Sequence, residues 1–412
     1  MPSRREPIWT GNFIAVSFVN LFVFLSFQMI FPTLPLYVKS LGGSDAVIGL
    51  VMGIFTAATL IARPTAGILL DRIGKKKVLL CGLGVFTVMV YLYGMVGSIA
   101  LIILVRLGHG LGWGLAGTST ATIAAEIIPK SRFAEGMGWF SLANGLSMAF
   151  APALGIYLGG LCGLRSVFLI AAAIALVSFG IGFFIKCSHR KNARLSKRLK
   201  VEIYEKSVIP TAVLMFCLTF TFGSIISFLP LYAYSQGIKS IGIFFSVYAV
   251  VILITRPLVG KAVDRFGFDV AIIPGFMLLF VAIVILSAAS VLQEFLLVAV
   301  IYGIGFGALQ TTIQTMAVRD VPHYRLGAAN ATLFTGLDLG MGIGVIVLGL
   351  IADRWGYRNM YLFTLIPVVF SALFYLFYAR RHRLAVPGGS CAAGLLCPRV
   401  GAGVRAQGVL KP

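Results

Sequence analysis

Four charged residues stand within long apolar stretches of the sequence: Arg63, Arg106, Arg256 and Asp338. On insertion scales, an arginine or aspartate at the centre of a membrane helix has a free-energy cost of about 2.5–3.5 kcal/mol. Each of the four therefore requires a compensating role. Asp338 is the only carboxylate well inside such a stretch, and a buried carboxyl group can carry a proton. We therefore consider Asp338 a candidate for proton coupling, with a fixed structural ion pair as the alternative. For Arg106, the alternatives are a structural role and a role in proton coupling or substrate binding.

A charged motif follows the second apolar stretch and recurs in the second half of the chain. In its first copy, Gly67, Asp71 and Gly74 precede three lysines. Gly67 permits close helix contact, Gly74 permits a tight turn, and the Asp71 carboxylate can cap the positively polarised N-terminus of a neighbouring helix. The motif predicts a cytoplasmic latch between two halves, the alternative being a loop that only fixes orientation. The residues assigned to this latch are Gly67, Asp71, Arg72, Gly74, Glu126, Arg132, Gly260, Asp264, Arg265, Gly267, Asp320 and Arg325.

Polar side chains within the apolar stretches are candidates to line a substrate cavity. Each of them, taken singly, is more often a hydrogen bond between two helices than a substrate contact. The candidates are Asn20, Gln28, His109, Asn144, Arg256, Gln310 and Gln314.

Residue types that bind metals or perform covalent catalysis are few and dispersed. The chain has four histidines and six cysteines, and its cysteines form no CxxC pair. No GxxxxGK[ST] loop is present to bind a nucleotide phosphate. Because an active site needs clustered His, Asp, Glu or Cys, we expect no enzymatic activity, no metal and no cofactor.

The composition explains why these residues are so isolated. Of 412 residues, 59% are hydrophobic and 11% are charged, whereas soluble chains have about 45–50% apolar and about 25% charged residues. This excludes a soluble enzyme, a disordered protein and a nucleic-acid-binding domain. The apolar runs are continuous, which excludes a β-barrel, and each is long enough to cross a membrane as a helix. Twelve such stretches are predicted: 12–38, 46–70, 78–97, 100–127, 136–160, 165–186, 208–233, 241–262, 270–289, 294–318, 328–352 and 358–379.

The basic residues predict the orientation of these spans. Of the 34 lysines and arginines, 26 fall in the termini and alternate connections on one side, and five fall on the other. The positive-inside rule then places both termini in the cytoplasm, in a multi-pass protein of the cell membrane. The same distribution explains the net charge of +21, with anionic lipid headgroups on that side as the counter-charge, so no nucleic acid is expected.

The longest polar connection divides the chain into two sets of six spans. We expect an N-terminal six-helix bundle at 1–186 and a basic cytoplasmic linker at 187–207. A C-terminal six-helix bundle at 208–383 and a disordered tail at 384–412 follow.

The two halves are internal repeats at a constant offset of 193 residues. Without a gap, the dipeptide Arg63-Pro64 recurs as Arg256-Pro257. Six helices is an even number, so both halves enter the membrane from the same side. The two bundles should therefore be related by a pseudo-two-fold axis along the membrane normal, an arrangement typical of secondary transporters. Asp338 breaks the symmetry because its mirror position is Gly145. Arg256 must then use Asn144, backbone carbonyls, water or an anionic substrate group.

Three segments resemble signatures of the major facilitator superfamily. The loop after Asp71 resembles the signature between the second and third spans of that family, and Arg106 followed by spaced glycines resembles its fourth-span signature. The segment 148–155, with Ala151, Pro152 and Gly155 as a helix-packing motif, resembles the fifth-span signature of its proton-coupled exporters. It departs from that signature in two places: Ala151 replaces the usual glycine before the proline, and Ile156 replaces the second of the two final glycines.

The resemblance implies a partner for the buried acid. The second and eleventh spans pack together between the halves in this family, and Arg63 and Asp338 lie at matching depths along them. We therefore expect a salt bridge that rocking of the halves would stretch, which makes Arg63 a further candidate for proton coupling.

The sequence thus predicts a transporter that exchanges protons for a small organic solute. The resemblance favours efflux of a drug-like or sugar-like molecule by a monomer. The alternative is a proton-coupled symporter that takes up a sugar or another metabolite, and a more remote one is a membrane receptor or scaffold that transports nothing.

Overall fold

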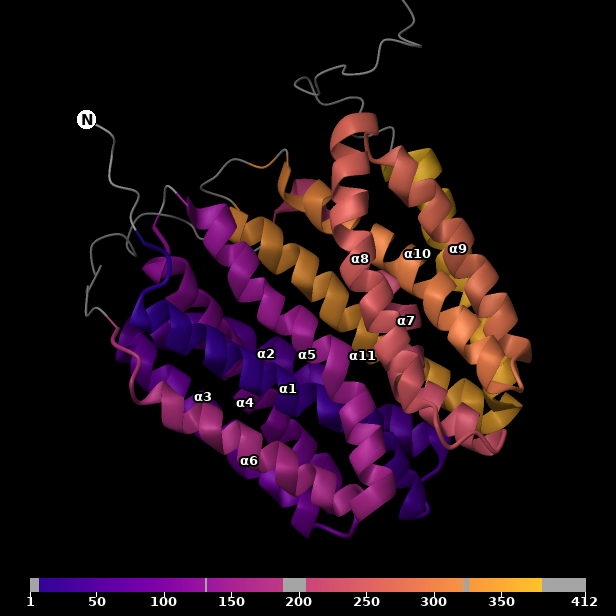
Figure 1. The fold of residues 1–412 in the computed structure, drawn as a ribbon, viewed down its shortest axis with the longest axis horizontal. Helices are drawn as coiled ribbons and strands as arrows, with labels where there is room; N and C mark the ends of the chain where they lie inside the picture. Colours follow the sequence, from indigo (N-terminus) through magenta and orange to yellow (C-terminus); the bar gives the residue numbers. More distant parts are fainter. Residues whose placement is uncertain (1–6, 130–131, 188–204, 320, 322–325, 380–412) are drawn as a thin grey trace, which may run out of the picture.

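The computed structural model describes residues 7–129, 132–187, 205–319, 321 and 326–379. Within these residues every regular element is a helix (Figure 1). The predicted tail, and the predicted linker apart from its ends, lie outside them.

The helices follow the apolar stretches because an apolar environment offers the backbone no water, and a helix satisfies its N–H and C=O groups within one segment. The hydroxyl oxygens of Thr10, Ser44 and Ser98 each accept a hydrogen bond from the backbone N–H three residues later, which fixes three helix starts. The helices are α1 (Gly11–Ser40), α2 (Asp45–Ile73), α3 (Lys75–Met95), α4 (Ile99–Ile127), α5 (Phe133–Cys162), α6 (Leu164–Gly182), α7 (Ile209–Ser235), α8 (Gly242–Phe266), α9 (Asp269–Ala288), α10 (Leu292–Arg319), α11 (Leu326–Phe363) and α12 (Leu365–Phe374).

Eleven helical segments in the described part of the chain are long and apolar enough to cross a membrane. The last of them, Ala328–Tyr378, has 51 residues, although about 20 suffice for one crossing. It is interrupted at Gly356, whose φ of 76° and ψ of 169° are not helical. The helix therefore breaks there, close to the boundary predicted between the last two spans.

The backbone conformation of six glycines repeats along the chain. Gly74 and Gly267 have φ values of 97° and 86°, and Gly163 and Gly356 have 84° and 76°. Both pairs are separated by 193 residues. Positive φ suits glycine because it has no Cβ, so each pair ends a helix at the same place in each half. The remaining pair, Gly42 and Gly237, is offset by two further residues.

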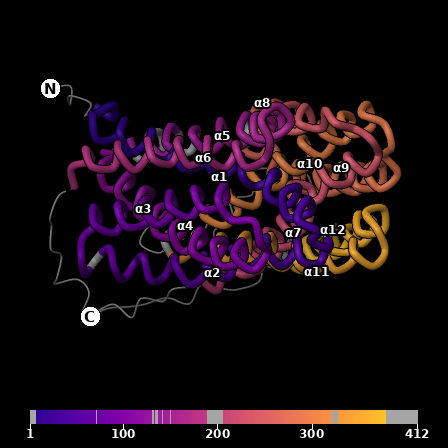
Figure 2. Tube along the Cα trace, turned by 90° about the horizontal axis from the view of Figure 1, so that it is seen from below, coloured from indigo at the N-terminus to yellow at the C-terminus, as the bar shows by residue number. Residues whose placement is uncertain are grey.

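Helices α1–α6 pack among themselves, as do α7–α12, and we call these groups the N-terminal and C-terminal halves (Figure 1). Three helix pairs connect the halves. Helix α2 packs against α11 and α5 packs against α8, on opposite sides of the molecule (Figure 2), and α1 packs less extensively against α7. Any movement between the halves must therefore act on these three pairs.

Candidate functional site

An ion pair between Arg63 on α2 and Asp338 on α11 joins the two halves. The Nη2 atom of Arg63 lies 3.2 Å from Oδ2 of Asp338 and donates a hydrogen bond of 3.4 Å to its Oδ1. The two side chains are 36% and 13% exposed. Oδ2 accepts no hydrogen bond within the described residues. The predicted contact is confirmed, and its hydrogen bonding is sparse.

The mirror position on the other side of the molecule has no carboxylate. Arg256 on α8 donates a hydrogen bond of 2.8 Å from Nη2 to the amide oxygen of Gln310 on α10. The predicted partner Asn144 is not used, because its Oδ1 accepts a hydrogen bond of 2.7 Å from Asn20. Both ends of the Arg256–Gln310 contact therefore belong to the C-terminal half.

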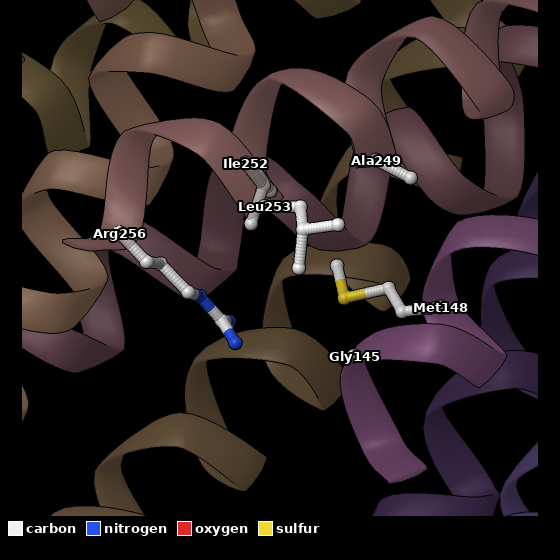
Figure 3. A pocket seen from close by; sticks show the side chains of 6 residues that line it. All are labelled: Gly145, Met148, Ala249, Ile252, Leu253 and Arg256. Carbon is white, nitrogen blue, oxygen red and sulfur yellow. The ribbon is translucent and has the colours of Figure 1, made fainter. Parts of the chain in front are cut away.

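A pocket lies beside Arg256 at the interface of α5 and α8. Figure 3 shows the guanidinium reaching from α8 toward the level of Gly145 on α5. The rest of the lining is apolar. The pocket is small, about 20 Å³ in this conformation, and is lined by Gly145, Met148, Ala249, Ile252, Leu253 and Arg256.

Arg106 on α4 is completely buried, without an acidic partner among the described residues. Its guanidinium carbon lies 4.5 Å from the centre of the Phe55 ring and 5.6 Å from that of Phe31. Its Nη1 is 3.4 Å from Nδ1 of His109, which also lies 3.2 Å from the hydroxyl of Tyr93. Because a guanidinium can only donate, His109 is the acceptor. Aromatic rings and an imidazole thus surround the guanidinium of Arg106.

Spaced glycines on α4 bring these aromatic side chains close. A Cβ atom at Gly110 would lie 2.7 Å from the carbonyl oxygen of Phe55, and one at Gly112 would lie 2.5 Å from the backbone nitrogen of Phe86. The sequence analysis missed Tyr93 and Phe55, since aromatic residues are too numerous in this chain for one of them to signal a site.

The other cavity candidates divide into two kinds. Asn20 joins α1 to α5, since its Nδ2 contacts both Asn144 and the carbonyl oxygen of Phe140, at 3.3 Å. His109 belongs to the Arg106 cluster, and Gln28 is buried on α1. Gln314 is partly exposed and makes no hydrogen bond within the described residues. Asn20 and Asn144 therefore form a hydrogen bond between two helices, which was the alternative to a substrate contact.

Replacing Asn144 by alanine should lower stability slightly and leave the substrate range unchanged. Interhelical hydrogen bonds in membranes average about 0.6 kcal/mol, and this one connects two helices of the same half. Thermal unfolding of the purified variant, together with its relative transport rates for several solutes, checks this. A changed order of preference among those solutes would instead place Asn144 in the binding cavity.

A second contact between the halves surrounds Asp45, at the start of α2. Its Oδ1 accepts hydrogen bonds from Lys39 Nζ at 2.8 Å and from the hydroxyl of Tyr357 at 3.0 Å. Its backbone N–H donates to Oδ1 of Asp353 at 3.1 Å. The sequence analysis did not identify this site. The available signal was an acidic residue next to the capping Ser44, but acidic residues are common in the first turn of any helix.

Glycines bring α2 and α11 together at this same end. A Cβ atom at Gly49 would lie 2.7 Å from the carbonyl oxygen of Val345, and one at Gly349 would lie 2.7 Å from that of Asp45. Contacts this short leave no room for a side chain. The halves are thus closed against each other at the Asp45 end.

A Gly49→Val substitution should prevent this closure, because the new side chain meets the backbone of α11. We expect transport to fall at least tenfold, and a cysteine introduced at Leu36, which lines a pocket beside Asp45, to react faster with an impermeant maleimide. The assay requires a background without the native cysteines. Gly160→Val is the matched control, since nothing lies within 4 Å of a Cβ there. Equal labelling of both variants would contradict the expected effect.

At the opposite end of α2, the predicted latch is described only in part. The side chain of Asp71 and residues 320 and 325 lie outside the described residues. Gly74 and Gly267 form the expected turns. Nothing lies within 4 Å of a Cβ at Gly67 or Gly260, so the expected close approach is absent, because α2 and α11 approach each other at the Asp45 end.

Other latch residues have local surroundings. Glu126 pairs in this conformation with Lys75 on the neighbouring helix of its own half. Asp264 is exposed near the end of α8, and Arg265 lies over the ring of Phe266. Arg72 is exposed and Arg132 stands at the N-cap of α5. The charged ends of the spans are thus open to solvent in this conformation.

The helix-packing motif of α5 has the role expected of it. A Cβ atom at Gly155 would lie 2.7 Å from the carbonyl oxygen of Met29 on α1, and Ala151 is fully buried beside Met29. Pro152 stands within the same helix.

These features define a multi-pass, all-helical membrane protein with two internally repeated halves and a charged pair between them. The model of the Major Facilitator Superfamily matches residues 16–323 and again residues 211–394. The chain belongs to this superfamily of transporters, as its sequence motifs indicated.

Curated relatives are similar over nearly the whole chain. An uncharacterized MFS-type transporter of Methanocaldococcus jannaschii is 26% identical over 85% of this chain and 94% of its own. The multidrug resistance protein MdtG of Salmonella paratyphi C is 28% identical over 93% of this chain and 99% of its own.

Solved structures share the fold. A bacterial homologue of the human lysosomal transporter Spinster, in an inward-facing and unoccupied conformation, gives a TM-score of 0.77 at 18% identity, covering 92% of this chain and 98% of its own. The nucleoside transporter NupG gives 0.68 at 15% identity, covering 89% and 98%.

Proposed function

We propose that this chain exports small organic molecules in exchange for protons. The observation that carries the proposal is the ion pair of Arg63 and Asp338, which connects the halves through the helices that must separate when they rock. A carboxylate beside a guanidinium is held in its charged form by attraction. Separation of the pair removes that attraction and favours protonation of Asp338, so proton binding and conformation become coupled.

In this proposal, twelve spans form two six-helix bundles related by a pseudo-two-fold axis, with a basic linker between them. The break at Gly356, the counterpart of Gly163, supports a twelfth span. The repeated glycine conformations support the symmetry. Superposing 48–132 on 241–325 without gaps tests it.

In this proposal the protein is a monomer in the cytoplasmic membrane. Both of its termini lie in the cytoplasm. The excess of basic residues at that end of the spans supports this orientation. The closed Asp45 end is then external, and the structure is inward-facing. Asp71 and Asp264, with the other latch residues, would close the cytoplasmic end in the outward-facing state.

Efflux is favoured by the similarity to multidrug resistance protein MdtG over 93% of the chain. The export direction is tested in inside-out vesicles that enclose a pH-sensitive dye. With the lumen acidified, exchange predicts that added ethidium enters the lumen while protons leave it.

The control is the same vesicle without the protein. Ethidium moving only in the opposite direction, together with protons, would support uptake by symport instead. A protein that binds solutes but moves none of several tested under either gradient would support the receptor alternative and overturn the proposal.

A further inference from the structure

The mirror position of the Arg63–Asp338 pair carries a positive charge without a negative one. Arg256 corresponds to Arg63, but Gly145 occupies the position that corresponds to Asp338. The hydrogen-bond partner of Arg256 is the neutral amide of Gln310, at 2.8 Å. A charged arginine within a span is expensive, and here the amide dipole offsets that cost only in part.

The missing carboxylate leaves space rather than a filled core. Nothing lies within 4 Å of a Cβ atom placed at Gly145. Gly145 and Arg256 line the same pocket, on α5 and α8 respectively (Figure 3). The pocket thus lies between the halves, where a bound molecule contacts both of them.

The lining combines one cation with an apolar wall. Met148 of α5 and Leu253 of α8 stand beside each other, and Ala249 and Ile252 complete the wall. A guanidinium binds a carboxylate through two parallel hydrogen bonds, and an apolar wall binds a hydrocarbon body. The combination suits the carboxylate and the hydrocarbon body of an amphiphilic organic acid.

We propose that this pocket binds the carboxylate of an organic substrate, which supplies at Arg256 the negative charge that Asp338 supplies at Arg63. The inference rests on the proposed transport function and names a substrate class for it. A carboxylate held by Arg256 would connect α8 to α5 only while the molecule is bound. Loading would therefore bias the position of the halves.

The test compares 2-naphthoate with 2-naphthylmethanol, which has a similar ring and no charge. Binding to the purified full chain in lipid nanodiscs is measured by calorimetry. Gly145→Asp restores the missing acid in the open space and should pair with Arg256. Gly145→Asn is the matched control, similar in size but uncharged, and chromatographic monodispersity confirms that both variants fold.

We expect the wild-type chain to bind 2-naphthoate at least tenfold more tightly than the alcohol. Gly145→Asp should weaken 2-naphthoate binding at least tenfold and leave the alcohol unaffected, whereas Gly145→Asn should keep the preference. Arg256→Gln should abolish it. Equal affinity of the wild-type chain for both probes, or undiminished 2-naphthoate binding by Gly145→Asp, would overturn the proposal.

The vesicle assay separates this proposal from the proposed function. Proton-driven movement of ethidium without preferential 2-naphthoate binding would leave the exporter standing and refute the carboxylate site. Preferential binding that Gly145→Asp removes, in a protein that moves nothing under a proton gradient, would refute the exporter and leave the site standing.

Discussion

An Asp338→Asn variant should lose transport driven by a proton gradient, at least tenfold, while its expression stays close to that of the wild-type chain. Asparagine has nearly the same shape but cannot bind and release a proton. It can still accept a hydrogen bond from Arg63, so the contact between α2 and α11 is weakened rather than replaced by a clash. The measurement is the initial rate of solute movement in proteoliposomes with and without an imposed pH difference.

Two further variants separate coupling from structure. Asp338→Glu keeps the titratable group and should keep most of the gradient-driven rate. Arg63→Gln leaves the carboxylate of Asp338 without its partner, which in a partly buried site costs up to about 3 kcal/mol, so it should lower stability as well as transport. Full gradient-driven transport by Asp338→Asn would show that the ion pair is structural.

Replacing Arg106 by methionine should lower the transport rate at least tenfold and yet stabilise the protein. The buried guanidinium costs about 2.5–3.5 kcal/mol to place within a span, and each of its two aromatic contacts returns about 0.5–2 kcal/mol. Methionine fills similar space among Phe31, Phe55 and Met52 without this cost. We expect a gain of about 1 kcal/mol in the free energy of unfolding and a transport rate at least tenfold lower.

The control is Arg106→Lys, which keeps the charge but loses the planar group that lies over the two rings. It should retain some transport and lose stability. Thermal denaturation in detergent and the proteoliposome rate are measured on the same preparations. A methionine variant that transports at the wild-type rate would mean that the charge of Arg106 is not needed for function.

Local chemistry let the sequence determine the spans and the repeat. Continuous apolar runs in a membrane must form helices, so the spans could be predicted from the sequence, and Gly74 was predicted as a turn that a side chain would strain. The depth of Arg63 and Asp338 followed from counting residues along two helices. Their contact could be predicted because both charges needed relief and the family resemblance paired their helices.

Which side chains contact one another was decided only by the tertiary structure. Helix rotation and the state of closure determine which side chains meet, and neither leaves a periodic signal in the sequence. Thus Arg256 uses Gln310 rather than Asn144, and Glu126 uses Lys75 of its own half. Gly67 faces open space because the halves are closed at the other end, where Asp45 meets groups brought from more than 300 residues away. A contact between halves exists in one conformation at a time, so only a folded state can show which contacts are made.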